Sequence, residues 1–123
     1  PQVVLFVDNV AAIDVKKLGE EIRYHKRFAP EGTNANFVQV INPDHIKIRT
    51  YERGVETETF ACGTGTVAAA VVGTALGRVK SPVKATTKGG AVLRVYFEVS
   101  DKKIKNVFLE GDAKVVFEGT LCD

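Results

Sequence analysis

The sequence predicts an α+β domain in which mostly antiparallel strands wrap around one central helix. The run 66–76 is rich in alanine and valine and has no polar face, which is typical of a buried helix. Short β-branched and aromatic stretches, separated by turn residues, lie on both sides of this run. With 123 residues, of which 45% are hydrophobic, the chain is long enough to form one domain with its own core.

The part of the chain before this helix is predicted to contain three strands and one short helix. Residues 2–7 are apolar enough to form a core strand. Asp14 is placed to cap a short helix, in which three apolar side chains share one face: Val15, Leu18 and Ile22. A loop at 28–33 follows, and then two strands, 36–41 and 46–51, are joined by a turn at Asn42-Pro43-Asp44.

Four further strands are predicted after the helix. They span residues 81–87, 93–97, 104–109 and 114–117. Gly89-Gly90 and Asp101-Lys102 supply turns, and Gly77 falls where the helix would end. The chain contains no internal repeat and no linker, so we expect a single domain.

The most informative residue is Cys62, in the sequence Ala61-Cys62-Gly63-Thr64-Gly65 at the start of the predicted helix. The first N–H groups of a helix have no internal partners and carry partial positive charge, so they stabilise a thiolate or bind an anion. The alternative is a small buried hydrophobic residue without chemistry. Gly63 and Gly65 favour the functional interpretation, because glycines allow close approach to the backbone.

Composition excludes several other classes of function. The formal net charge of +2 is too small to indicate a nucleic-acid partner, and the local cluster of Lys102, Lys103 and Lys105 is typical of a solvated turn or edge strand. No apolar run reaches membrane-spanning length, and no secretory signal is recognised. Two widely separated cysteines make a sparse disulfide framework and favour a reducing cytoplasm; Cys122 is expected to be a tail thiol.

The beginning of the chain predicts a larger parent protein. The sequence has no methionine and enters a core strand directly after Pro1. We therefore expect the chain to be a piece of a longer polypeptide.

The segments around Cys62 resemble the C-terminal half of diaminopimelate epimerase. The resemblance rests on YERGV at 51–55 and ETFACGTG at 58–65, with support from FAPEGTNANF at 28–37 and VFEG at 116–119. It covers nearly the whole chain, so it implies that residues 1–123 form the C-terminal domain, with the N-terminal half absent. The family fold has two pseudo-symmetric halves, each a set of strands around a central helix.

The resemblance also implies a reaction, the interconversion of LL- and meso-diaminopimelate without pyridoxal phosphate, metal or other cofactor. Two cysteines, one from each half, would face opposite sides of the substrate α-carbon, one removing a proton and the other delivering one. Inverting a stereocentre needs such a base and acid. Charge develops towards the α-carboxylate, where N–H donors stabilise the transition state.

By resemblance, Cys62 is one catalytic acid/base, and Gly63 and Thr64 bind the substrate carboxylate. Thr64 has the alternative of being only a helix cap. A cysteine hydrolase is disfavoured, because neither His25 nor His45 has a sequence context that marks it as the base of the thiol. Both histidines are expected at the surface, and neither has metal-ligand spacing.

The remaining substrate-binding residues implied by the resemblance are Asn34, Glu52 and Arg53. The planar fork of Arg53 suits the distal carboxylate. Glu52 would accept a hydrogen bond from the substrate ammonium and raise the proton affinity of the thiol. The alternatives are an exposed strand-end pair for Glu52 and Arg53, and a turn residue for Asn34.

The sequence departs from the family pattern at two points. Gln2 stands where the family has a histidine near the thiol, and glutamine carries no proton near neutral pH. No second cysteine motif is present, since Cys122 opens no helix, so the missing half is an expected partner and the isolated chain is expected to be inactive. Phe117 falls where the family has an aromatic at its dimer contact, which leaves a homodimer open; a core aromatic is the alternative.

Two other functions remain open from the sequence. The first is a proline-racemase-like or other cofactor-independent isomerase, which Arg53 and Asn34 disfavour because they suit a second charged amino-acid head group. The second is a non-catalytic binding domain with an inert thiol. Exchange assays with proline and diaminopimelate distinguish the first from the main hypothesis, and thiol alkylation tests the second.

Overall fold

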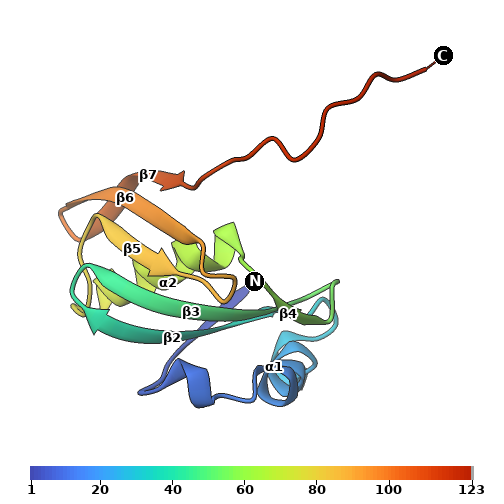
Figure 1. The fold of residues 1–123 in the computed structure, drawn as a ribbon. Coiled ribbons are helices and arrows are strands. Elements are labelled where there is room, and N and C mark those ends of the chain that lie inside the picture. Colours follow the sequence, from blue (N-terminus) through green and yellow to red (C-terminus); the bar gives the residue numbers. More distant parts are fainter. Residues whose placement is uncertain (123) are drawn as a thin grey trace.

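The computed structural model describes residues 1–122 and has one curved mixed sheet with two α-helices (Figure 1). The strands are β1 Gln2–Phe6, β2 Asn34–Asn42, β3 His45–Glu52, β4 Thr57–Thr59, β5 Val83–Thr86, β6 Val92–Ser100 and β7 Lys103–Glu110. Their order is β1-β2-β3-β5-β6-β7, with β4 pairing off this path with β3. Within residues 1–122, β1–β2 and β3–β5 are parallel and four other pairs are antiparallel, which confirms the predicted α+β class and its mostly antiparallel strands.

Helix α1, Val15–Arg23, begins as predicted at Asp14. The Asp14 carboxylate accepts a hydrogen bond from the Lys17 N–H at 3.1 Å, which satisfies one of the free donors of the first turn. Val15 is buried and Ile22 half-buried, but Leu18 is 37% exposed. The close contact with the sheet is made instead by Gly19, where an added Cβ would overlap Tyr51.

Helix α2, Gly63–Ala75, starts one turn earlier than the predicted alanine run and is followed by Gly77 at φ +71°, as expected for a glycine that ends a helix. Small residues make up its buried face: Gly65, Thr66, Ala69, Ala70 and Gly73. These let the helix approach the sheet closely. Its opposite side, with Val67 and Val71, is half-buried, so the described strands cover the helix on one side.

The alternation of side chains along the strands separates two apolar clusters. Ala35 and Phe37 face α1, whereas Val38 packs with Ala69 and Ala70 of α2. Successive side chains along a strand point to opposite faces, so Asn36, which lies between Ala35 and Phe37, projects towards α2. This places a polar side chain under the start of the central helix.

The predicted strand at 114–117 is wrong. Residues 111–122 contain no strand and extend away from the body of the molecule (Figure 1). Val116 and Phe117 are 85% and 82% exposed, so Phe117 is not the core aromatic that the sequence allowed. The physical reason is that no strand within residues 1–122 pairs with this segment, and β-structure requires such a partner.

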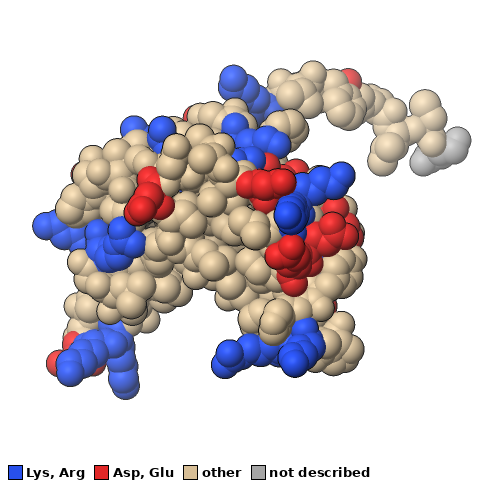
Figure 2. All heavy atoms as spheres, turned by 90° about the horizontal axis from the view of Figure 1, so that it is seen from below, with Lys and Arg blue, Asp and Glu red and all other residues tan. Residues whose placement is uncertain are grey.

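The surface carries both signs of charge. In Figure 2 acidic and basic side chains are interspersed, and neither covers a large continuous area of this face. Lys102, Lys103 and Lys105 lie exposed in the β6–β7 turn and on β7, as predicted. No helix in residues 1–122 has the length and apolar character needed to cross a membrane.

Candidate active site

Cys62 caps α2, with an extended backbone at φ −137° and ψ 111°. Its sulfur accepts a hydrogen bond from the Gly65 N–H at 3.4 Å and lies 3.5 Å from the Thr64 Oγ1 atom. The thiol therefore lies against the amides of the first helical turn, as the sequence predicts. Because the sulfur takes the position of the cap, the alternative in which Thr64 only caps the helix is wrong.

The thiol is largely covered, with Cys62 only 8% exposed, yet it borders an open depression of about 520 Å³. The lining residues are Glu52, Ala61, Cys62, Gly63, Thr64, Val67 and Leu109. The end of β3, the start of α2 and the outer strand β7 thus meet around the sulfur. The depression brings together four of the sequence-predicted residues: Glu52, Cys62, Gly63 and Thr64.

Asn34 and Arg53 do not line this depression, but they contact each other beside Glu52. Asn34 is the first residue of β2, not a turn residue, and its Oδ1 accepts a hydrogen bond from the Arg53 N–H at 2.8 Å. The exposed Arg53 guanidinium donates to the carbonyl of Glu31 at 3.3 Å. A hydrogen-bonded pair therefore lies at the end of β3, adjacent in sequence to a residue of the depression.

A buried hydrogen-bond network centred on Asn36, not predicted from the sequence, supports the start of α2. Its Nδ2 donates to the Gln2 Oε1 and to the Val3 carbonyl, both at 2.9 Å. Its Oδ1 accepts from the Thr50 hydroxyl at 2.8 Å. Gln2 in turn donates to the Thr64 Oγ1 at 3.1 Å, so residue 2 does lie near the thiol. An asparagine between Ala35 and Phe37 in an apolar strand is the signal that would have indicated a buried polar contact.

Gly65 lets this network and the thiol meet. A Cβ at this position would overlap the Asn36 Oδ1 and lie 3.3 Å from the Cys62 sulfur. The group that closely approaches this glycine is a side chain of the same chain, so the contact seen here is one of packing.

Two carboxylates that do not line the depression, Glu56 and Glu58, have lowered pKa values. Burial favours a raised pKa for Glu58, but hydrogen bonds and positive charge from Arg49 and Lys88 outweigh it and lower the pKa. Hydrogen bonding to Arg23 lowers the pKa of Glu56. Both carboxylates thus remain ionised as partners of arginines.

Neither histidine borders the thiol. His45 begins β3, at the opposite end from Glu52, and burial together with the charge of Lys84 lowers its pKa. It is half-buried and hydrogen-bonded with Thr86 at 2.9 Å, so its predicted surface position is only partly correct. His25 is exposed, as predicted. Among residues 1–122 no group of three or more His, Cys, Asp or Glu side chains is arranged to hold a metal ion.

The chain is similar in sequence to proteins of one enzyme family. The sequence model of a family described as diaminopimelate epimerase matches residues 1–116. The diaminopimelate epimerase of Aquifex aeolicus is 49% identical, with 100% of this chain and 43% of that protein covered. That of Chlorobaculum tepidum is 44% identical, with 98% and 46% covered. The chain therefore spans less than half the length of these curated relatives.

A solved structure supports the fold. The crystal structure of the Bacillus anthracis phenazine biosynthesis protein of the PhzF family matches with a TM-score of 0.57 at 19% identity, covering 86% of this chain and 33% of that chain. At this identity the likeness concerns the fold alone.

Proposed function

The chain belongs to the diaminopimelate epimerase family, and from this premise we propose that residues 1–123 form the C-terminal domain of an enzyme that interconverts LL- and meso-diaminopimelate. The observation that carries the proposal is the Cys62 sulfur, held at a helix start on the edge of an open depression. The family match favours this substrate over the proline-racemase-like alternative.

Cys62 acts as one of two acid/base groups. In one direction its thiolate takes the proton from the α-carbon, and a thiol on the opposite face delivers a proton to the resulting carbanion; in the reverse direction the roles exchange. The second cysteine belongs to the N-terminal half of the parent polypeptide. Because the reaction needs both cysteines, the 123-residue chain is inactive alone.

The start of α2 binds the substrate α-carboxylate. Within residues 1–122 the Gly65 amide donates to the sulfur and the Thr66 amide to the Cys62 carbonyl. The amides of Gly63 and Thr64 precede the first intrahelical bond and remain available to an anion. Negative charge that develops on the carboxylate as the α-proton leaves is stabilised by these donors.

The other end of the substrate binds at the end of β3. Arg53 offers a planar fork to the distal carboxylate, and Asn34 holds the backbone from which this arginine extends. Glu52, in the depression with the thiol, accepts a hydrogen bond from the substrate ammonium.

Gln2 contributes by hydrogen bonding and not by proton transfer. Its amide donates to Thr64 and accepts from Asn36, so it links β1 to the start of α2. Since a glutamine amide does not titrate near neutral pH, we assign both proton transfers to thiols.

The proposed enzyme serves lysine and cell-wall precursor synthesis in the cytoplasm. The sparse use of cysteine, with both Cys62 and Cys122 free, supports a reducing compartment.

The test is deuterium incorporation at the α-carbon of diaminopimelate in deuterated water, with the full-length polypeptide. We expect rapid exchange, its loss in C62S, and none with proline. C122S is the matched control, because that thiol lies exposed in the tail, and it should exchange at the wild-type rate. Equal exchange by C62S and the wild type would show that the assigned role is wrong.

A further inference from the structure

Arg23, the last residue of α1, makes contacts that the proposed mechanism does not use. Its side chain is only 14% exposed, although it ends a surface helix. It contacts two other segments, the 53–56 turn between β3 and β4 and the loop before β2. These two segments carry or flank Arg53 and Asn34, the proposed contacts for the distal end of the substrate.

The first contact fixes the turn. Arg23 donates from Nε and Nη2 to both carboxylate oxygens of Glu56, with three distances between 2.8 and 3.0 Å. Such a two-point contact restrains orientation as well as distance. Glu56 itself has φ +58°, a left-handed conformation that non-glycine residues seldom adopt unless their surroundings impose it.

The second contact fixes the loop. The Nη1 of Arg23 donates to the Glu31 carbonyl at 3.4 Å, and the Nη1 of Arg53 donates to the same oxygen at 3.3 Å. One carbonyl therefore joins the two arginines. A Cβ on the next residue, Gly32, would overlap the Arg23 guanidinium, and Gly32 has φ +77°. The loop is thus shaped to receive the Arg23 side chain.

We propose that Arg23 is a positioning residue for substrate binding: it holds the 53–56 turn against the 31–34 loop, so that Arg53 and Asn34 keep the geometry needed for the distal carboxylate. This inference rests on the proposed function for its substrate. The hydrogen bonds of the pair also raise the pKa of Arg23 and lower that of Glu56, so both stay charged across the working range of pH.

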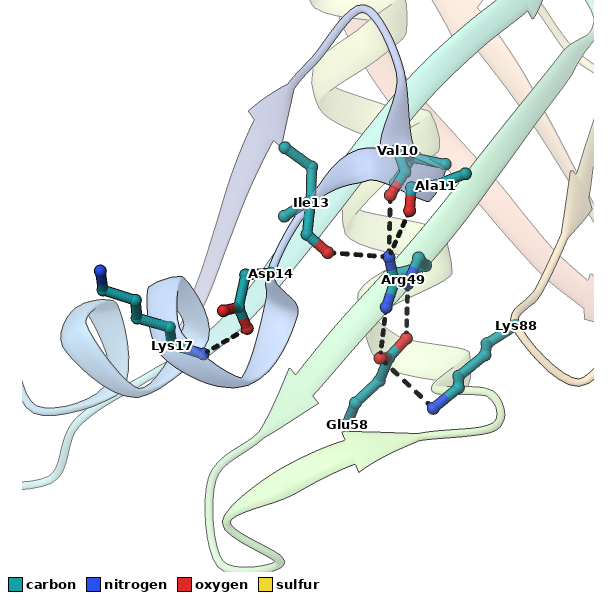
Figure 3. A network of polar contacts seen from close by, with 8 residues as sticks. All are labelled: Val10, Ala11, Ile13, Asp14, Lys17, Arg49, Glu58 and Lys88. Atoms are coloured by element: carbon teal, nitrogen blue, oxygen red, sulfur yellow. Dashed lines mark hydrogen bonds and ion pairs between the residues drawn. The ribbon is translucent and has the colours of Figure 1, made fainter.

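The chain offers a matched control in a second arginine–glutamate pair, shown in Figure 3. Arg49 donates to both oxygens of Glu58 at 2.7 Å, and to the carbonyls of Val10 and Ile13 at 2.9 and 3.0 Å. This pair has the same chemistry but ties β3 and β4 to the segment around the short 3-10 helix Val10–Ala12. Among the described residues, Arg49 forms no hydrogen bond with the 31–34 loop.

The experiment compares R23Q and R49Q in the full-length protein, by steady-state kinetics with diaminopimelate. We expect R23Q to raise KM on the order of tenfold with little change in kcat, because misplaced binding groups weaken ground and transition states alike. R49Q should keep the wild-type KM, because a substitution that only destabilises the fold lowers the fraction of active enzyme and hence the apparent kcat. R23K, which keeps the charge but not the fork, should fall between R23Q and the wild type.

A double-mutant cycle sharpens the test. If Arg23 acts through Arg53, the effects of R23Q and R53Q on KM are not additive, and R23Q adds little once R53Q is present. An unchanged KM in R23Q, equal increases in R23Q and R49Q, or additive effects with R53Q would each overturn the proposal. If R23Q does not fold, the KM of R23K is compared with that of R49Q instead.

A readout independent of activity separates this proposal from the proposed function. Hydrogen exchange of the peptide that contains residues 53–56, measured by mass spectrometry on the same proteins, should speed up about tenfold in R23Q and not in R49Q, because the held turn opens more often. If the wild type does not act on diaminopimelate, the proposed function fails, and this exchange alone decides whether Arg23 holds the turn. Wild-type exchange in R23Q would overturn the positioning role.

Discussion

Gly65→Ala introduces one methyl group where the central helix, the buried asparagine and the thiol meet. The new Cβ would overlap the Asn36 Oδ1 and lie 3.1 Å from its Cγ and 3.3 Å from the Cys62 sulfur. Asn36 is fully buried and hydrogen-bonded on both sides of its amide, so it cannot move away without breaking contacts. The substitution therefore forces either the helix or the asparagine to shift.

The expected cost follows from three contributions. Overpacking a dense core costs about 1–3 kcal/mol. Breaking the buried hydrogen bond from the Thr50 hydroxyl to Asn36 costs about 1–3 kcal/mol more. Alanine recovers about 0.5–1 kcal/mol over glycine through helix propensity. We therefore expect the free energy of unfolding to fall by about 3 kcal/mol.

Urea unfolding followed by circular dichroism measures this change. For an m-value of about 2 kcal/mol/M, the midpoint should move down by about 1.5 M. Gly63→Ala is the matched control in the same helical turn. Its Cβ would meet only the Cδ2 of Leu109 at 2.9 Å, the end of a side chain that is 45% exposed and free to rotate. This variant should unfold within about 1 kcal/mol of the wild type. Equal midpoints for the two variants would refute the packing argument.

Two further predictions concern the periphery of the domain. The pKa of Glu58 is lower in the folded state than its ordinary value of 4.5. Ionised Glu58 therefore stabilises the fold at any pH above 4.5, and this stabilisation is lost as the pH falls through the folded-state pKa. Glu58→Gln should therefore lower the free energy of unfolding by about 2 kcal/mol at pH 7 and by progressively less below pH 4.5. Urea unfolding at each pH measures this effect. A difference between variant and wild type that stays the same at every pH would contradict the pairing with Arg49. Ending the chain at Asp112 should leave the urea midpoint of the isolated chain unchanged, because residues 113–122 are exposed; a marked drop would show that the tail packs on the body.

The parts of the fold that depend on local sequence were predictable. Asp14 caps α1 and Cys62 lies at the start of α2, because a cap is decided by a few consecutive residues. The alternating strands β2 and β3 and the turn between them follow from period-two patterning and from Pro43. The family resemblance predicted further site residues, and two of them, Glu52 and Thr64, line the same depression as the thiol.

The parts that depend on distant partners were not predictable. Arg23 and Glu56 are 33 residues apart, and nothing in either local sequence marks them as a pair. The burial of Asn36 depends on the faces of three strands and one helix. Residues 114–117, of which three are apolar and two are valines, have the local composition of a strand but no neighbouring strand among the described residues to pair with. Propensity alone does not supply that partner.

The most direct test of the central claim is alkylation of Cys62 and Cys122 in the full-length protein, with and without diaminopimelate, followed by peptide mass spectrometry. Cys62 borders the depression and Cys122 lies in the exposed tail, so the second thiol is an internal reference in every sample. If the Cys62 sulfur faces bound substrate, diaminopimelate slows labelling of Cys62 and leaves Cys122 unaffected. Labelling of Cys62 at the same rate with and without saturating diaminopimelate would contradict the placement of the reacting carbon beside this sulfur.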